Sequence, residues 1–321
     1  MRVGFVYNVR RSDSAEGDEN AEFDEPETIE AISNALASHG HEVIGLEADR
    51  TLPAALVAAD VDVVFNIAEG KGQRGREAQV PALLELLGIP YTGSDAVTLG
   101  ITLDKPVAST LVRAAGVATP RGFVLSGGDD PLPEGLLFPA IVKPVHEGSS
   151  KGISSDSIVV DEAALRLQVR EISTRYGQAV LCEEYVSGRE ITVGLLGLPV
   201  RVLPPMEIVF LEGGAFPLYS FDVKRRFEEL VRYEVPAALT PAELTAIETA
   251  SLVAFEALGC RDVARLDFRL DAAGAPHFLE CNPLPGLAPG VGDLTFIAEA
   301  AGLSFEDLIG EILEGALRRR P

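Results

Sequence analysis

Two short motifs in the C-terminal third of the chain have the residue types of a magnesium site. RLD ends at Asp267, ECN begins at Glu280, and the apolar runs around them predict the two strands of a hairpin. If Asp267 pairs near Glu280, the alternation along each strand brings Arg265 and Asn282 to the same face. Hard oxygen ligands suit Mg²⁺, so Asp267, Glu280 and Asn282 are candidate metal ligands. An ion pair between Arg265 and one acid is the alternative, but it leaves the other acid and Asn282 without a role.

A lysine-bearing loop follows an apolar, strand-like run in the middle of the chain. Lys143 ends the run FPAIVK, so its stem is expected to be partly buried and its ammonium to need an anionic partner. The EGSSKG residues that follow can wrap a phosphate with backbone N–H groups, although the order of a Walker A motif is absent. Taken alone, this loop is better explained as a glycine–serine surface turn.

The lysines and the acidic hairpin together predict a nucleotide site. Lys105, Lys143, Lys224 and Arg265 are positive groups in a chain whose net charge is −22. Lysines balance phosphate charge and Mg²⁺ bridges phosphate oxygens. The combination therefore predicts a site for a magnesium–nucleoside triphosphate.

The bulk properties of the 321 residues exclude several classes of protein. A net charge of −22 argues against binding to nucleic acid, which requires basic groups facing phosphates. Neither a run of 18 apolar residues nor a signal-peptide pattern is present, so no membrane span or membrane partner is expected. Cys182, Cys260 and Cys281 form no CxxC pair, so we expect free thiols in a reducing cytoplasm.

The order of the expected elements predicts an α/β unit followed by α+β units. Strands and helices alternate over roughly the first 90 residues, which is typical of a doubly wound parallel sheet. The stretch 13–30 carries nine acidic residues and no basic one. A solvated loop is the favoured interpretation, and a lid or a site for a cationic substrate is the alternative.

The later segments predict a different order of helices and strands. We expect a helix and a strand in 102–125, strands at 138–144 and 152–160, a helix at 161–177, two strands around a Ser-Gly turn in 179–197, a capped helix at 240–260, the hairpin in 263–287 and a closing helix at 304–320.

Six motifs occur in an order that resembles the ATP-grasp ligases, and within them the D-alanine–D-alanine ligase family. They are YTGS, LDKPVA, VKPVHEGSSKG, CEEYVSGRE, VARLDF and LECNPLPGL. The resemblance covers essentially the whole chain and is tightest from about residue 79 to 290. It implies an N-terminal Rossmann-like substrate domain at 1–92, a central ATP-grasp subdomain at 93–183 and a C-terminal ATP-grasp subdomain at 184–321.

The resemblance also implies the roles of individual residues. Lys105 and Lys143 match lysines on the α- and β-phosphates, and Lys224 matches the γ-phosphate lysine of a mobile loop. Arg265 and the backbone N–H of Gly286 match groups that stabilise a tetrahedral oxyanion. Asp267, Glu280 and Asn282 match the magnesium ligands. The residues implied for the glycine-rich loop and for the adenosine are Glu147, Gly148, Ser149, Ser150, Glu183, Glu184, Tyr185, Val186, Glu190 and Leu279.

The activity implied by the resemblance is ATP-dependent joining of a carboxylate to an amine. The carboxylate becomes an acyl phosphate, the amine attacks it, and ADP and phosphate leave. Lys224, Ser150, Arg265 and Gly286 are the implied catalytic groups. The cofactors would be ATP and two Mg²⁺ ions, with Mn²⁺ as an alternative, and a homodimer in the cytoplasm is expected from the family.

The chain departs from the family on the amino-acid side. The glycine-glycine turn with its Ser-x-Glu is missing, and Glu16, Glu22 and Glu27 are the candidates to replace that glutamate. Glu69 replaces a histidine of the family, Arg225, followed by Arg226, replaces a tyrosine, and Val291 replaces a serine. These four residues and Gly286 are the candidate substrate residues.

Because the pocket's polar groups set specificity, we expect D-alanine plus D-alanine not to be the best substrate pair. Arg225 and Arg226, which follow Lys224, either receive an acidic substrate or belong to a solvent-facing basic loop. The alternatives for the whole chain are a true D-alanine–D-alanine ligase of cell-wall synthesis and a nucleotide-binding protein without ligase activity.

Overall fold

The chain forms three sheets in the part that the structure describes, which comprises residues 1–11, 18, 20–72, 74–211 and 214–319 of a computed structural model. The first sheet is parallel and has the order β2–β1–β3. Its strands are β1 (Arg2–Tyr7), β2 (Glu42–Glu47) and β3 (Val63–Asn66).

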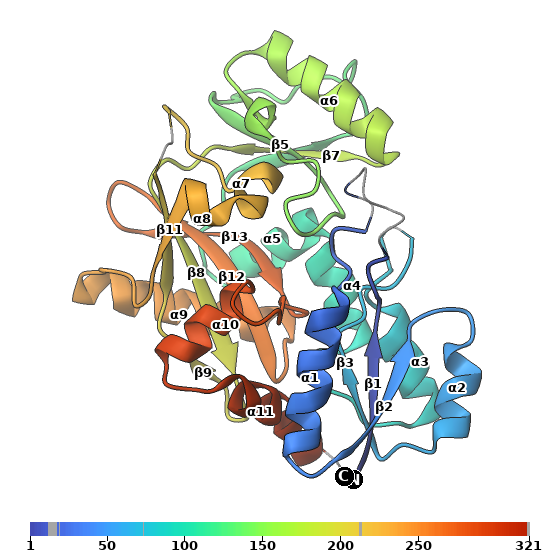
Figure 1. The fold of residues 1–321 in the computed structure, drawn as a ribbon. Coiled ribbons are helices and arrows are strands. Elements are labelled where there is room, and N and C mark those ends of the chain that lie inside the picture. Colours follow the sequence, from blue (N-terminus) through green and yellow to red (C-terminus); the bar gives the residue numbers. More distant parts are fainter. Residues whose placement is uncertain (12–17, 19, 73, 212–213, 320–321) are drawn as a thin grey trace.

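Helices cover both faces of this parallel sheet, as Figure 1 shows in blue and cyan. Alternate residues of β1 face opposite ways, so Phe5 packs with Ile32 of α1 (Pro26–Ser38), whereas Val6 packs with residues of α2 (Leu52–Ala59) and α3 (Gln79–Leu87). The expected doubly wound α/β unit is confirmed.

The second sheet is antiparallel and is covered by one helix at the top of Figure 1. Its order is β4–β7–β5–β6. Helix α6 (Glu162–Tyr176) packs on it, beginning at the side chain of Asp161 and ending at Gly177, whose φ of 61° is left-handed. The strands are β4 (Gly122–Leu125), β5 (Ala140–Pro144), β6 (Ile158–Val159) and β7 (Val180–Glu184).

The third sheet is also antiparallel, which confirms the expected α+β pattern. Its order is β11–β10–β8–β12–β13, with β9 beside β8. The strands are β8 (Arg189–Leu196), β9 (Arg201–Val202), β10 (Met206–Phe210), β11 (Val231–Glu234), β12 (Val263–Leu270) and β13 (Pro276–Asn282). The helices around it are α4 (Ala96–Leu103), α5 (Lys105–Ala114), α7 (Phe221–Arg225), α8 (Phe227–Leu230), α9 (Pro241–Leu258), α10 (Asp293–Ala300) and α11 (Phe305–Arg318).

The Ser-Gly turn after β7 carries the chain from one antiparallel sheet to the other. Gly188 has a φ of +137°, and a Cβ there would lie 1.9 Å from the carbonyl oxygen of Leu270. Only glycine fits this close approach of two backbones. The two strands expected around this turn are present, but they belong to different sheets.

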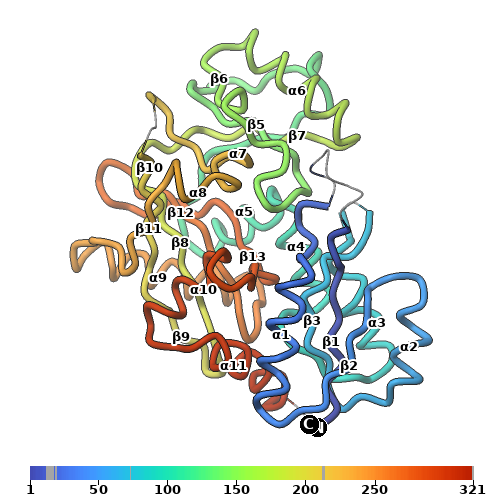
Figure 2. The backbone as a smooth tube through the Cα atoms, in the orientation of Figure 1, coloured from blue at the N-terminus to red at the C-terminus, as the bar shows by residue number. Residues whose placement is uncertain are grey.

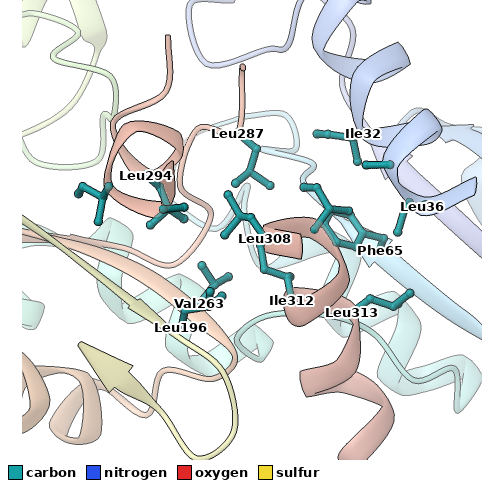
Figure 3. Close-up of a cluster of buried hydrophobic side chains, with 14 of the residues drawn as sticks. Ile32, Leu36, Phe65, Leu196, Val263, Leu287, Leu294, Leu308, Ile312 and Leu313 are labelled. Carbon is teal, nitrogen blue, oxygen red and sulfur yellow. The ribbon is translucent and has the colours of Figure 1, made fainter. Parts of the chain in front are cut away.

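Helix α11 joins the N-terminal unit to the third sheet through one apolar core. Figure 3 shows Leu308 and Ile312 between Phe65 of β3 on one side and Val263 of β12 on the other. All four side chains are at most 4% exposed. The closing helix therefore fixes the parallel sheet against the third sheet.

Two expected elements differ from the structure. The helix expected in 102–125 is preceded by a second helix, and Asp104 ends α4 and caps α5 by accepting a hydrogen bond from Val107 N at 3.3 Å. The strand expected at 152–160 is wrong in its first half, where Ser154 caps a 3₁₀ turn at Ser155–Ser157. Serine side chains compete locally for backbone hydrogen bonds, and this favours the turn over an extended strand.

Helices α4 and α5 precede the second sheet in sequence but pack elsewhere. Ala108 and Val112 of α5 share a core with Ile191 of β8 and Phe255 of α9. The three-part division at residues 92 and 183 stays a prediction, with these two helices in contact with the C-terminal part. No helix of the described residues has the length and apolar character that a membrane crossing requires.

Replacing Leu308 by alanine tests whether α11 holds the parallel sheet against the third sheet. The variant leaves a cavity between two units, so its free energy of unfolding should fall by roughly 2–5 kcal/mol. Urea unfolding followed by circular dichroism measures the change. Leu86→Ala on α3, where the side chain is 83% exposed, is the control and should change little. Equal losses of unfolding free energy in the two variants would contradict this role of α11.

Candidate active site

The β12–β13 hairpin forms as the sequence predicts and brings the four polar residues together. Asp267 lies opposite Glu280, and Arg265 lies opposite Asn282. Arg265 donates to both carboxylate oxygens of Asp267, at 3.1 and 2.9 Å, and its Nη1 lies 3.2 Å from Asp293. Asn282 Nδ2 donates to Asp267 at 3.1 Å. The ion pair of Arg265 is therefore present, and so is a patch of two acids and one amide, which we call the acid–amide patch and which consists of Asp267, Glu280 and Asn282.

A register shift after Asp267 explains how neighbouring residues of β13 reach one cavity. Phe268 pairs with Phe278, so one residue is skipped on β13 between the two pairs. Such a bulge turns adjacent side chains toward the same side. Leu279 and Glu280 accordingly line the same cavity.

The acid–amide patch fits a divalent cation. Burial raises the pKa of Asp267 against the opposing charge of Arg265. Burial also opposes ionisation of Glu280, but Lys105, Lys143 and Arg265 together lower its pKa to about 2. Among the described residues no group of three or more His, Cys, Asp or Glu gathers as a metal cage. Two carboxylates and one amide suit Mg²⁺, which takes its remaining oxygens from phosphate and water.

Two adjoining cavities of about 100 and 80 Å³ open beside this patch. After the ligands expected from the sequence, we name the first, which includes Glu69, Asn282 and Gly286, the substrate cavity. The second, which includes Lys143, Glu190 and Leu279, is named the nucleotide cavity. The residues that line both are Lys105, Glu147, Ser149, Lys224, Arg265 and Glu280.

The two buried lysines have acidic partners from distant segments. Lys143 Nζ lies 2.6 Å from Glu183 of β7, and Lys105 Nζ lies 3.6 Å from Glu280 and donates to the carbonyl of Glu147. Burial opposes the charge of Lys143, but Glu183 raises its pKa. The anionic partner expected for Lys143 is therefore found. Glu183 lies beneath that lysine and is 2% exposed, and its expected contact with adenine stays a prediction.

Arg269, which the sequence analysis missed, organises the segment expected to bind adenosine. It donates to Glu190 at 2.7 Å, to the carbonyl of Val186 at 3.1 Å and to the hydroxyl of Tyr185 at 2.6 Å. Burial raises the pKa of Glu190 against the charge of Arg269. The alternation that places Arg265 and Asp267 on one face of β12 also includes Arg269, and this signal could have found it. Glu184 is half-buried and lines a separate hollow beside Arg121.

The glycine-rich loop is held in a strained conformation beside the lysines. Ser149 and Ser150 have φ values of 48° and 57°, which non-glycine residues rarely adopt. Ser150 Oγ donates to the carbonyl of Tyr219 at 3.0 Å. Figure 2 shows α7 next to this loop, and Phe221 N donates to the carbonyl of Ile153 at 3.1 Å. Lys224 on α7 thereby faces both cavities from the loop side.

The N-terminal unit grips the same loop through Glu22. Its Oε1 accepts hydrogen bonds from Arg76 Nη2 at 2.6 Å and from Gly148 N at 2.8 Å, and Lys151 lies 3.5 Å from Oε2. The Arg76 and Glu22 side chains are 4% and 6% exposed. No sequence motif indicated this contact, because it joins residues 54 and 126 positions apart.

The remaining predicted substrate residues divide into two groups. Glu69 and Gly286 line the substrate cavity. Arg225 ends α7 and Arg226 follows it; both are exposed, Arg226 pairs with Glu229, and Val291 is 56% exposed. These three lie outside the two cavities, and their part in substrate binding stays a prediction. Glu27 is exposed on α1, and Glu16 lies outside the described residues.

Two antiparallel sheets close on the nucleotide cavity, and buried lysines face the acid–amide patch. This arrangement is that of an ATP-grasp enzyme. The family model described as "D-ala D-ala ligase C-terminus" matches residues 130–314. The chain is 36% identical over 297 residues to D-alanine–D-alanine ligase of Syntrophotalea carbinolica, covering 91% of both chains. It is 38% identical over 299 residues to the uncharacterised protein y4sG of Sinorhizobium fredii, covering 90% of this chain and 87% of that one.

Solved structures agree with these relatives. The crystal structure of D-alanine–D-alanine ligase from Bacillus anthracis complexed with ATP has a TM-score of 0.76 and 25% identity, covering 99% of this chain and 97% of that one. VanG D-Ala:D-Ser ligase from Enterococcus faecalis, at 20% identity and a TM-score of 0.75, shares the fold and covers 98% of this chain and 99% of that one. The chain belongs to the D-alanine–D-alanine ligase family, and it is an ATP-dependent ligase of that type.

Glu22→Gln tests the grip on the glycine-rich loop. The variant removes the charge that holds Arg76 and Lys151, so backbone amides of residues 146–152 should exchange with deuterium faster than in the parent protein. Hydrogen–deuterium exchange with mass spectrometry measures the rate. Glu27→Gln, an exposed glutamate on α1, is the matched control. Unchanged exchange in Glu22→Gln would show that the contact does not hold the loop.

Proposed function

We propose that the protein activates a carboxylate as an acyl phosphate and joins it to an amine, with a substrate pair other than D-alanine and D-alanine. The observation that supports this proposal most directly is that the two cavities share a wall. Lys105, Lys224 and Arg265 face both, so a triphosphate in one would end beside a carboxylate in the other. Positioning of this kind, together with electrostatic stabilisation, supplies most of the catalysis in phosphoryl transfer.

Each residue has a role that follows from its place. Lys105 and Lys143 would offset the charge of the phosphates, and Lys224 would hold the group that is transferred. Arg265 and the backbone N–H of Gly286, which both line the substrate cavity, would stabilise the oxyanion when the amine attacks.

Asp267, Glu280 and Asn282 would hold Mg²⁺, which supplies neutralisation of phosphate charge when bound. The loop at Ser149 and Ser150 would exclude water from the acyl phosphate. The cytoplasmic location and a homodimer stay predictions from the family.

Altered specificity rests on the amino-acid side of the site. Glu69 stands in the substrate cavity where the family has a histidine, and Glu22 is already held by Arg76 and Gly148. The curated relatives named D-alanine–D-alanine ligase, at 34–37% identity, support the alternative that the chain makes D-alanyl-D-alanine. A direct assay separates the two proposals.

Asp267→Asn and Glu280→Gln test the metal patch. Each variant removes one negative oxygen ligand, so ADP release with magnesium and ATP should fall by roughly 100-fold or more. The control is Asp156→Asn, an exposed acid near the second sheet. Full turnover in either of the first two variants would refute the metal assignment.

A substrate panel tests the specificity. ADP release is measured with magnesium, ATP and pairs of amino acids in both configurations, and products are identified by mass. We expect at least one pair to exceed D-alanine plus D-alanine in kcat/KM, because the pocket's charged groups differ from the family's. D-alanyl-D-alanine as the fastest product would establish the alternative.

A further inference from the structure

Two of the three cysteines lie next to each other in the core behind the acid–amide patch. The Sγ atoms of Cys260 and Cys281 are 3.6 Å apart, although the residues are separated by 21 positions in the sequence. Both are buried, at 8% and 5% exposure, and they belong to the core that α9 shares with the third sheet. Cys182, the third cysteine, lies in the core of the second sheet. The pair is therefore a product of tertiary packing.

Cys281 stands between two of the three proposed magnesium ligands. Glu280 precedes it and Asn282 follows it on β13. Because side chains alternate along a strand, the thiol of Cys281 points into the core while its two neighbours face the site. The residue also borders the substrate cavity, through which a small molecule can approach. Any displacement of Cys281 moves Glu280 and Asn282 with it.

The two cysteines are anchored to different degrees. Cys260 follows α9, where its backbone N–H donates to the carbonyl of Phe255 at 3.0 Å and Gly259 ends the helix in a left-handed conformation. Strand β13, in contrast, is the last strand in the order of its sheet and is hydrogen-bonded to β12 alone among the described strands. Its register already shifts next to Glu280. When the two sulfurs approach each other, β13 is therefore the side that moves.

We propose that Cys260 and Cys281 are a modification site at which oxidation forms a reversible disulfide and displaces Glu280 and Asn282 from the magnesium position. A disulfide requires an S–S distance of about 2.0 Å, so the sulfurs must move about 1.5 Å closer. Mg²⁺ tolerates little deviation from octahedral geometry, so a shift of this order in β13 weakens its ligation. The inference goes beyond the proposed function, and the disulfide can be detected whether or not that function is correct.

A hydroperoxide is the class of oxidant, and hydrogen peroxide is its simplest member. One thiol sulfur attacks a peroxide oxygen, the O–O bond breaks, and a sulfenic acid forms as water leaves. The second thiol attacks the sulfenic sulfur, the S–S bond forms, and the sulfenic oxygen leaves as a second water with the proton of that thiol. The two sulfurs together lose two electrons, which reduce the peroxide. A dithiol reductant reverses the reaction by exchange.

The two steps differ in rate. Burial, reinforced by the Cys260 thiol, raises the pKa of the Cys281 thiol well above its usual range, so thiolate is scarce and the first step is slow. The second step is intramolecular between neighbouring sulfurs, so it outpaces further oxidation of the sulfenic acid. The pair therefore responds to sustained exposure and returns to thiols when a reductant is supplied.

Peroxide treatment of the full chain tests the modification. The protein is incubated with hydrogen peroxide overnight, the peroxide is removed with catalase, the remaining thiols are alkylated in denaturant, and the peptides are analysed by mass. We expect a cross-linked species that joins the peptides of Cys260 and Cys281 and is lost on treatment with dithiothreitol, with Cys182 alkylated. Absence of that species would overturn the proposal.

Calorimetry with ATP and magnesium measures the consequence for the site. The affinity of the oxidised parent protein should be roughly tenfold lower or more, because two ligands are displaced, and dithiothreitol should restore it. Cys260→Ala cannot form the disulfide and should keep its affinity after peroxide. Cys182→Ala, the matched control, retains the pair and should lose affinity as the parent does.

Unchanged affinity in the oxidised parent protein, or an equal loss in Cys260→Ala, would overturn the effect on the magnesium position. Thermal unfolding checks that the variants are folded, and Cys260→Ser replaces the alanine variant if that one is not. The peptide analysis uses the parent protein, so it decides the modification without any variant.

Discussion

Charge balance among buried ionic side chains is the constraint on which the rest of this structure depends. Lys143 is paired with Glu183 at 2.6 Å, and Arg265 lies 2.9 Å from Asp267. Breaking such a buried pair leaves an uncompensated charge at a cost of several kcal/mol. A triphosphate accompanied by divalent cations carries little net charge. It can therefore pair with these buried groups without leaving any of them uncompensated in an apolar surrounding.

The fold supplies these charges from segments far apart in sequence. The antiparallel register of β12 and β13 sets the acid–amide patch, and a slip of one residue would turn Arg265 and Asp267 to the opposite face. The first turn of α5 provides Lys105, and α7 provides Lys224. Because α11 wedges the parallel sheet against the third sheet, Glu22 reaches the glycine-rich loop from the N-terminal unit.

Local patterns in the sequence were sufficient for the parts of the site that lie within one hairpin or one loop. The period-two alternation around Asp267 and Glu280 predicted their pairing, and Thr240 with Glu243 forms the capping box that begins α9. The resemblance supplied the lysines from several segments. Contacts between residues that only tertiary packing brings together could not be predicted from local sequence patterns.

Long-range partners have no periodic signal in the sequence. The contact of Glu22 with Arg76 and the pairing of Lys143 with Glu183 depend on how separate units dock. Nothing in the local sequence marked Glu77 as a residue that lines the substrate cavity. On the substrate side the resemblance indicated Glu69 and Gly286, but the contacts of Glu22 became visible only in the structure, while the nucleotide side was already indicated by its motifs.

Oxygen transfer from the carboxylate to phosphate tests the central claim most directly. The enzyme is supplied with magnesium, ATP, an amine and its carboxylate substrate labelled with ¹⁸O in both carboxyl oxygens, and the inorganic phosphate is analysed by mass. Formation of an acyl phosphate requires a carboxylate oxygen to bond to the transferred phosphorus, and attack by the amine leaves that oxygen on phosphate. The account predicts one ¹⁸O in each phosphate released with product, and unlabelled phosphate accompanying amide formation would contradict it.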